Sequence, residues 1–327
     1  MSSSPVPIRE QVRLWGPDRS SQLQTEEAVA YCRALADGHY ENFSVVSALV
    51  PRSLRDDFAA VYGFCRWADD LGDEIGDPEE SLRLLHWWRE ELAACFAGEP
   101  KHPVMVALLQ TVQRHDLPRK PFDDLIDAFV QDQTVDRYAN WQQLLDYCAL
   151  SANPVGRLVL MLLGEERSRS FFEPSDAICT ALQLTNHWQD VRRDILERDR
   201  IYLPAEMIKY ERFEERLRAS AEKGYAVDGR FLDESRAVIE ECVHRTQRLY
   251  DKGEVLLDRV APQSRPVIGL FIAGGTRVLR LVELWNYETA LHRPRLSRIA
   301  KLSLVARAWI GARLAKETKP PRSGGQQ

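Results

Sequence analysis

The sequence predicts an all-α protein, folded as a single-domain helical bundle. Apolar residues recur at intervals of three and four from Thr25 to about Lys316, which is the period of a helix with one buried face. No run of alternating β-branched residues, which would indicate a strand, is present. Glycines and prolines divide the pattern into segments of helix length, and no linker separates those segments into domains.

The helices can be placed in order from their caps and breakers. Thr25 can cap the first, and Glu26 and Glu27 suit the positive end of its dipole. Pro51 and Ser53 begin the second. Further helices are predicted at about 80–97, 102–115, 122–132, 140–163, 175–198, 229–259, 264–286 and 296–316. We expect residues 1–24 to be a flexible segment, 25–319 the folded domain and the polar stretch 320–327 a disordered tail.

The composition excludes several classes of function. Of the 327 residues, 44% are hydrophobic and 28% are charged, which suits a sizeable core under a polar surface. The net charge of −5 provides no basic field for nucleic acid. The N-terminus lacks the apolar region of a signal peptide, and the longest apolar stretches, such as Val267–Gly275, are far shorter than the ~18 residues of a spanning helix. We expect a cytoplasmic protein, with any membrane contact peripheral.

The remaining motifs indicate structure rather than chemistry. Six scattered cysteines lie in apolar helical patterns, which favours buried free thiols over disulfides or zinc sites. Gly274-Gly275 indicates close helix packing, because the sequence contains neither G-x-G-x-x-G nor G-K-[ST]. The absence of a dinucleotide fingerprint agrees with chemistry that needs no nicotinamide.

Two helices carry aspartates where their stripes should be apolar. Asp69 and Asp73 in YGFCRWADDLGDE are four residues apart on one helical face, and Asp190 and Asp194 repeat that spacing. Burying four carboxylates without partners would cost several kcal/mol each. Mg²⁺ is the natural partner, since it takes oxygen ligands and completes its shell with water and phosphate oxygens. About three Mg²⁺ ions would balance four carboxylates and a diphosphate.

Polar companions strengthen this interpretation. Tyr62 and Arg66 precede the first pair on its face, and Gln183 and Asn186 precede the second. A single D-x-x-x-D on a helix is usually a solvated face, and that alternative stays open from spacing alone. Two copies, each with polar companions on the acidic face, favour a shared metal site.

Five segments together resemble the squalene/phytoene synthase family over roughly residues 31–300. They are HYENFSVVSALVP (39–51), YGFCRWADDLGDE (62–74), DYCALSANPVG (146–156), NHWQDVRRDILERDRIYLP (186–204) and NYETALHRPRLSR (286–298). Their order along the chain makes the match specific, which D-x-x-x-D alone would not be. The resemblance implies the isoprenoid synthase fold and a prenyl diphosphate substrate.

The resemblance also implies roles for individual residues. The Mg²⁺–diphosphate cluster would be bound by Asp69, Asp73, Asn186, Asp190 and Asp194. The diphosphate and prenyl site would be lined by His39, Asn42, Tyr62, Arg66, Gln183 and Tyr287, with Phe43 and Tyr147 facing the hydrocarbon. Catalysis would fall to Tyr62, Arg66 and the four aspartates.

Two departures indicate a branch within the family. Gln189 stands where the phytoene type commonly has arginine, and Ser151–Gly156 replaces a small, glycine-rich stretch. With the HYENF opening, these resemble the hydroxysqualene synthase branch of bacterial hopanoid synthesis, in which presqualene diphosphate is ionised and water ends the reaction without a reductant. Asn153 is the candidate for placing that water.

Three alternatives stay open. A sister enzyme would condense two prenyl diphosphates into presqualene diphosphate, squalene or phytoene. A non-catalytic assembly factor also resembles this family, but that type tends to lose the acidic motifs, which are present here. The basic, amphipathic segment 296–316 either lies on an anionic membrane or closes the bundle.

Overall fold

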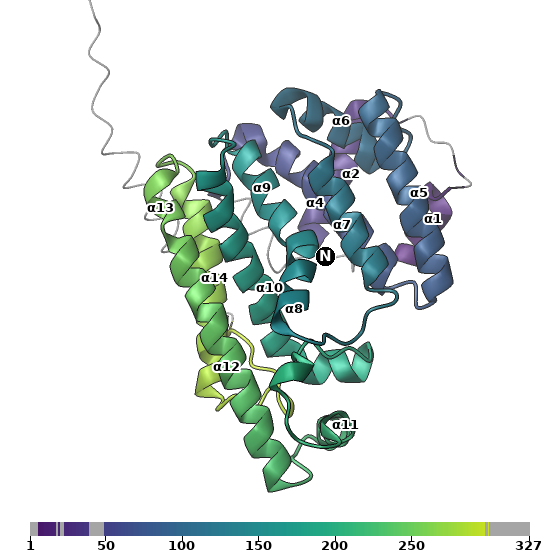
Figure 1. Ribbon diagram of the computed structural model, residues 1–327. Coiled ribbons are helices and arrows are strands. Elements are labelled where there is room, and N and C mark those ends of the chain that lie inside the picture. Colours follow the sequence, from purple (N-terminus) through teal and green to yellow (C-terminus); the bar gives the residue numbers. More distant parts are fainter. Residues whose placement is uncertain (1–5, 18, 20–22, 39–48, 298–299, 301–327) are drawn as a thin grey trace, which may run out of the picture.

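The structure is a computed structural model that describes residues 6–17, 19, 23–38, 49–297 and 300. Within these ranges the chain is helical, and its one β-type contact is an isolated bridge between Arg137 and Ile201 (Figure 1). The predicted all-α class is confirmed. No helix in the described ranges combines the length and apolarity needed to cross a bilayer.

The first half of the chain is built around α4. The helices described in this half are α1 (Ile8–Trp15), α2 (Thr25–Gly38), α4 (Arg55–Asp73), α5 (Pro78–Ala97), α6 (Pro103–His115) and α7 (Lys120–Gln131), with a short 3₁₀ turn η1 (Arg52–Leu54). Helices α2, α5, α6 and α7 all pack against α4. Phe64, Trp67 and Trp88 stack at the centre of this group and are fully buried. The dense aromatic core holds α4 rigidly in place.

The second half is built around α10. Its helices are α8 (Trp141–Ser151), α9 (Asn153–Leu162), α10 (Arg169–Glu197), α11 (Phe213–Lys223), α12 (Gly229–Glu254), α13 (Leu256–Arg259) and α14 (Arg265–Leu284), with a 3₁₀ turn η2 (Ala205–Met207). Helices α8, α9, α11, α12 and α14 contact α10. Figure 1 shows α12 and α14 along one side of the molecule and α5 and α6 at the opposite side. The two halves meet at the centre, where α7 of the first contacts α9 of the second.

Several helix ends differ from the prediction. The segment 140–163 is divided at Ala152 because Pro154, which has no N–H to donate, begins a new helix there. Helix α10 begins at Arg169, six residues before the predicted start at 175. Helix α11 was not predicted, since its sequence FEERLRASAEK has few apolar residues. Helix α1 lies in the segment predicted to be flexible, and its Ile8 is buried. Of the predicted helix 296–316, only residues 296, 297 and 300 are described.

The predictions for cysteine and glycine can be compared with the packing. All six cysteines are free thiols, as the sequence indicated; four are buried as predicted, whereas Cys65 and Cys179 are only partly buried. A Cβ added to Gly275 would lie 1.9 Å from the Tyr250 hydroxyl oxygen and 2.7 Å from Leu182 Cδ2, whereas one added to Gly274 would meet nothing within 4 Å. Close helix packing is therefore confirmed for Gly275 but not for Gly274.

Candidate active site

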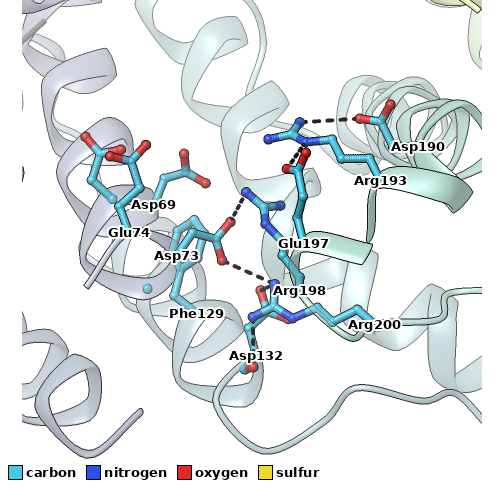
Figure 2. Close-up of polar contacts among 12 residues, drawn as sticks. Asp69, Asp73, Glu74, Phe129, Asp132, Asp190, Arg193, Glu197, Arg198 and Arg200 are labelled. Carbon is cyan, nitrogen blue, oxygen red and sulfur yellow. Dashed lines mark hydrogen bonds and ion pairs between the residues drawn. The ribbon is translucent and has the colours of Figure 1, made fainter. Parts of the chain in front are cut away.

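The acidic end of α4 lies beside the end of α10. Asp73, on the last turn of α4, pairs with Arg198 and Arg200 in the loop that follows α10, with N–O distances of 2.8 and 3.2 Å (Figure 2). These two ion pairs connect α4, which carries Asp69 and Asp73, to the loop after α10, which carries Asp190 and Asp194. The structure therefore brings together two segments that lie far apart in the sequence.

Asp132, at the end of α7, adds a carboxylate that was not among the four predicted aspartates to this junction. The Tyr147 hydroxyl donates to its Oδ2 at 2.9 Å, and Arg200 donates to its main-chain oxygen at 2.9 Å. Only 8% of Asp132 is exposed, and burial raises its pKa to about 7. The sequence analysis missed this residue; the one available signal was a charge directly after an apolar helix. Asp132 links Tyr147 to Arg200, and through Arg200 to Asp73.

Arg66 is held by carboxylates of its own helix. Its Nε donates to buried Asp70 at 2.8 Å, its Nη2 lies 3.0 Å from Glu74, and its Nη1 lies 3.5 Å from Asp69. Desolvation raises the pKa of Asp70 to about 8 even with Arg66 beside it. The guanidinium is thus fixed at the acidic end of α4, where it was predicted to bind diphosphate.

On α10, Asp190 is paired with a residue that the sequence analysis did not single out. Arg293, in the segment after α14, donates Nη2 to Asp190 Oδ2 at 2.9 Å and Nε to Oδ1. Gln189 donates to the Pro294 main-chain oxygen. The only signal for Arg293 was its place in the motif NYETALHRPRLSR. The segment after α14 therefore lies along the acidic stretch of α10.

Among the described residues, neither Asp69 nor Asp194 forms an arginine ion pair as close as those of Asp73 and Asp190. Asp194 is 5% exposed, and its pKa is raised to about 7, first by burial and then by repulsion from Asp190. Desolvation and then repulsion from Asp73 raise the pKa of Asp69 to about 6. Both carboxylates would be stabilised by an added cation.

The residues were tested for their fit to Mg²⁺. Among the described residues, no three His, Cys, Asp or Glu side chains approach closely enough to form a ready metal cluster. The donor set is nevertheless of the right kind. It contains four carboxylates, of which Asp69 and Asp194 have raised pKa values, and the exposed amide of Asn186 on α10. These residues fit a hard cation chemically.

The remaining predicted residues are spread around this junction. Tyr62 lies partly buried on α4, and Gln183 partly buried on α10. Asn153 begins α9, where its Oδ1 accepts a hydrogen bond from Thr180 at 2.9 Å. Tyr287 follows α14 in a left-handed conformation with φ of 60°. His39, Asn42 and Phe43 lie outside the described residues, so their predicted roles stay predictions.

An apolar pocket lies farther along α10, between α9, α10 and α14. It has a cavity volume of about 90 Å³ and is lined mainly by aliphatic side chains and Phe271. Leu182, one of its lining residues, is eight residues before Asp190, which corresponds to about 12 Å along a helix. The pocket is therefore within reach of a prenyl chain whose diphosphate lies at Asp190.

Tyr147, predicted to face the hydrocarbon, lies instead in a buried aromatic cluster. Its ring is 5.6 Å from that of Tyr138 and 6.1 Å from those of Tyr202 and His187, centroid to centroid. His187 stacks on Tyr202 at 3.6 Å, and burial lowers its pKa to about 3, which keeps it neutral. The cluster positions the Tyr147 hydroxyl on Asp132.

Comparisons with known proteins indicate one family. The family model described as squalene/phytoene synthase matches residues 36–300. A hydroxysqualene synthase of Zymomonas mobilis is 38% identical over 197 residues, which cover 58% of this chain and 64% of that protein. A 15-cis-phytoene synthase of Synechococcus elongatus is 27% identical over 309 residues, which cover 90% of this chain and 97% of that protein.

A solved structure gives the same result. The crystal structure of squalene synthase HpnC from Alicyclobacillus acidocaldarius superposes with a TM-score of 0.70, is 39% identical, and is matched over 82% of this chain and 97% of that one. The match to the Zymomonas mobilis relative spans less than two thirds of that relative's length. With the family model matched over most of the chain and the acidic helices in place, this chain belongs to the squalene/phytoene synthase family.

Proposed function

We propose that this protein is a hydroxysqualene synthase, which converts presqualene diphosphate and water into hydroxysqualene and diphosphate. One observation carries the proposal: Arg198 and Arg200 join the acidic face of α4 to the end of α10, and an apolar pocket begins about 12 Å before Asp190 along that helix. A polar junction beside a hydrocarbon pocket suits an amphiphile with a charged head and a long apolar tail. The identity to hydroxysqualene synthases supports the choice within the family.

The acidic residues would hold the leaving group through metal ions. Asp69, Asp73, Asn186, Asp190 and Asp194 would bind Mg²⁺, which when bound would neutralise the negative charge of the diphosphate. The arginines at the junction add fixed positive charge at the place where the departing diphosphate develops its charge. This arrangement favours cleavage of the carbon–oxygen bond to the diphosphate.

The rest of the reaction needs no reductant. The carbon–diphosphate bond breaks with its electron pair on the diphosphate, a water oxygen bonds to the cation, and the water's proton leaves to diphosphate or solvent. No electrons are exchanged with a cofactor, which agrees with the expected absence of nicotinamide. The apolar lining of the pocket keeps other nucleophiles away from the cation.

Gln189 supports a substrate that carries one diphosphate. Its amide donates to the Pro294 main-chain oxygen, so it offers no charged, bidentate contact to a second diphosphate. The runner-up, a condensing sister enzyme, is favoured by one observation: Arg293 reaches Asp190 from another segment and brings a guanidinium close to that position. The two candidates differ in their products.

Product analysis with the purified full chain and Mg²⁺ tests the proposal. Presqualene diphosphate should be converted to hydroxysqualene at the same rate with and without NADPH, and farnesyl diphosphate should give little condensation product. Extracted products are identified by mass spectrometry. Efficient formation of presqualene diphosphate, squalene or phytoene from simple prenyl diphosphates would assign the chain to the sister branch instead.

Thermal stability provides an independent test of the metal site. Burial raises the folded-state pKa of Asp194 to about 7. Below about pH 4 the carboxyl is protonated in both the folded and the unfolded protein. As pH rises from there toward 7 it ionises in the unfolded protein first, so the folded state loses stability. A cation that binds the carboxylates offsets this cost. Millimolar Mg²⁺ should therefore raise Tm more at pH 8 than at pH 5, as measured by differential scanning fluorimetry.

The matched variant for this test carries Asp69→Asn and Asp194→Asn. In metal-free buffer at pH 8 it should be more stable than the wild type, since it removes the buried carboxylate of Asp194 and the repulsion between Asp69, whose side chain is 44% exposed, and Asp73. It should also lose most of the Mg²⁺ response. An equal Tm increase for both proteins would contradict the metal-site assignment.

A further inference from the structure

The loop after α10 turns sharply between the two arginines that pair with Asp73. Arg198 follows the last residue of α10, and Asp199 has a left-handed main chain with φ of 53°. The main-chain N–H groups of Arg198 and Arg200 both donate to the Asp194 main-chain oxygen at 3.1 Å. Figure 2 shows the guanidinium groups on either side of the turn directed at one carboxylate, that of Asp73.

The left-handed residue is what allows both arginines to reach the same carboxylate. If Asp199 were right-handed and continued the helix, residues 198 and 200 would lie about 200° apart around the helix axis. Residues other than glycine rarely adopt the left-handed conformation, although aspartate does so more readily than most. The turn therefore costs free energy, which contacts from other segments can offset.

Arg137, in the segment between α7 and α8, contacts this turn from outside the acidic faces. Its Nη2 lies 2.9 Å from Asp199 Oδ1, and its Nη1 donates to the Asp199 main-chain oxygen. Nη1 also donates at 3.0 Å to the Asp136 main-chain oxygen, which accepts the Ile201 N–H at 2.9 Å. One guanidinium thus holds both the side chain and the main chain of the left-handed residue.

The Arg137 guanidinium is itself anchored on α11. Its Nε donates to Glu214 Oε2 at 3.2 Å and its Nη2 donates to Oε1, which makes a bidentate pair. Arg218 of α11 also pairs with Asp199. The Arg137 side chain is 30% exposed, so each ion pair alone contributes little to stability. The planar guanidinium nevertheless fixes three segments relative to one another, because its donors point in set directions.

We propose that Arg137 is a positioning residue, which holds the left-handed turn at Asp199 so that the arginines on either side both face Asp73. Among the described residues, its side chain bonds or pairs with Asp136, Asp199 and Glu214, none of which was predicted to bind metal or diphosphate. The effect of Arg137 on the reaction rests on the proposed function, whereas its effect on the loop does not.

Hydrogen exchange of the full chain, followed by mass spectrometry, tests the effect on the loop. In an Arg137→Gln variant, peptides covering residues 196–203 should exchange about tenfold faster than in the wild type, because the hydrogen-bonded amides of Arg200 and Ile201 open more often. Peptides from α4 and α12 should exchange at the wild-type rate. Unchanged exchange in the loop, or faster exchange throughout the protein, would overturn the proposal.

Steady-state kinetics with presqualene diphosphate test the effect on the reaction. The diphosphate is already charged before its bond to carbon breaks, so loosened arginines should weaken the binding of substrate and transition state alike. For Arg137→Gln, KM should therefore rise about fivefold while kcat stays within about twofold of the wild-type value. A lower kcat at an unchanged KM is the result expected of a partly unfolded enzyme, and it would contradict the positioning role.

Arg169→Gln is the matched control, since Arg169 is an exposed arginine on the first turn of α10 that pairs with Glu173 at 2.6 Å. This variant removes the same charge and the same kind of ion pair, and it should leave loop exchange and KM unchanged. Equal effects of the two substitutions would overturn the proposal. If the wild type does not consume presqualene diphosphate, the proposed function fails, and hydrogen exchange still decides whether Arg137 holds the loop.

Discussion

An Asp190→Asn variant should release diphosphate from presqualene diphosphate about 10²–10³-fold more slowly than the wild type, the usual cost of removing one group that stabilises the charge of a transition state. Asp190 lies at the centre of the second acidic face, and its carboxylate is already placed by Arg293. Asparagine keeps the size of the side chain but removes a charged ligand. A coupled diphosphate-release assay measures the loss.

Circular dichroism should show that the variant keeps the wild-type helical content, because Asp190 makes its side-chain contacts to arginines and not to the core. The control is Asp136→Asn, an exposed aspartate between α7 and α8 whose ion pair with Arg137 is long, at 3.8 Å. It should keep full activity. If Asp190→Asn released diphosphate at the wild-type rate, Asp190 would not be part of the catalytic site.

A Gly275→Ala variant should be destabilised by about 2–4 kcal/mol, which combines overpacking with a broken hydrogen bond. The new Cβ would overlap the Tyr250 hydroxyl, 1.9 Å away. Tyr250 is 1% exposed, and its hydroxyl lies 3.0 Å from Thr185 Oγ1 of α10, so it cannot move without breaking that contact. Urea unfolding followed by circular dichroism gives the change in free energy.

The neighbouring glycine is the natural control. Gly274→Ala adds the same methyl group to the same helix, but nothing lies within 4 Å of the new Cβ. It should be neutral, or stabilising by up to about 1 kcal/mol because alanine favours the helix. Similar losses for both variants would show that the effect belongs to α14 itself and not to the contact with Tyr250.

The fold class was predictable because helical periodicity is a local property. The caps that begin helices are local too: Asp77, Asn140 and Asp228 each accept a hydrogen bond from a main-chain N–H three residues later. Predictions failed where tertiary contacts decide the outcome. Helix α11 is polar overall, and only the burial of residues such as Phe213 and Leu217 against the second core holds it.

The candidate site was predictable in part for the same reason. The spacing of Asp69 and Asp73 is visible in the sequence, as is that of Asp190 and Asp194. Their partners are not, because they come from elsewhere: Arg200 reaches Asp73 across 127 positions of the chain, and Arg293 reaches Asp190 across 103. Asp132 was missed because nothing near it in the sequence reveals that Tyr147 and Arg200 converge on it.

The arginines paired with Asp73 and Asp190 compete with metal ions for these two carboxylates. Each of these carboxylates must give up a guanidinium before it can accept a different cation, so the protein alone should bind divalent ions weakly. A ligand rich in phosphate oxygens changes the balance, because it offers the released arginines new partners. Metal and diphosphate should therefore bind with positive heterotropic linkage, each raising the affinity for the other by the same factor.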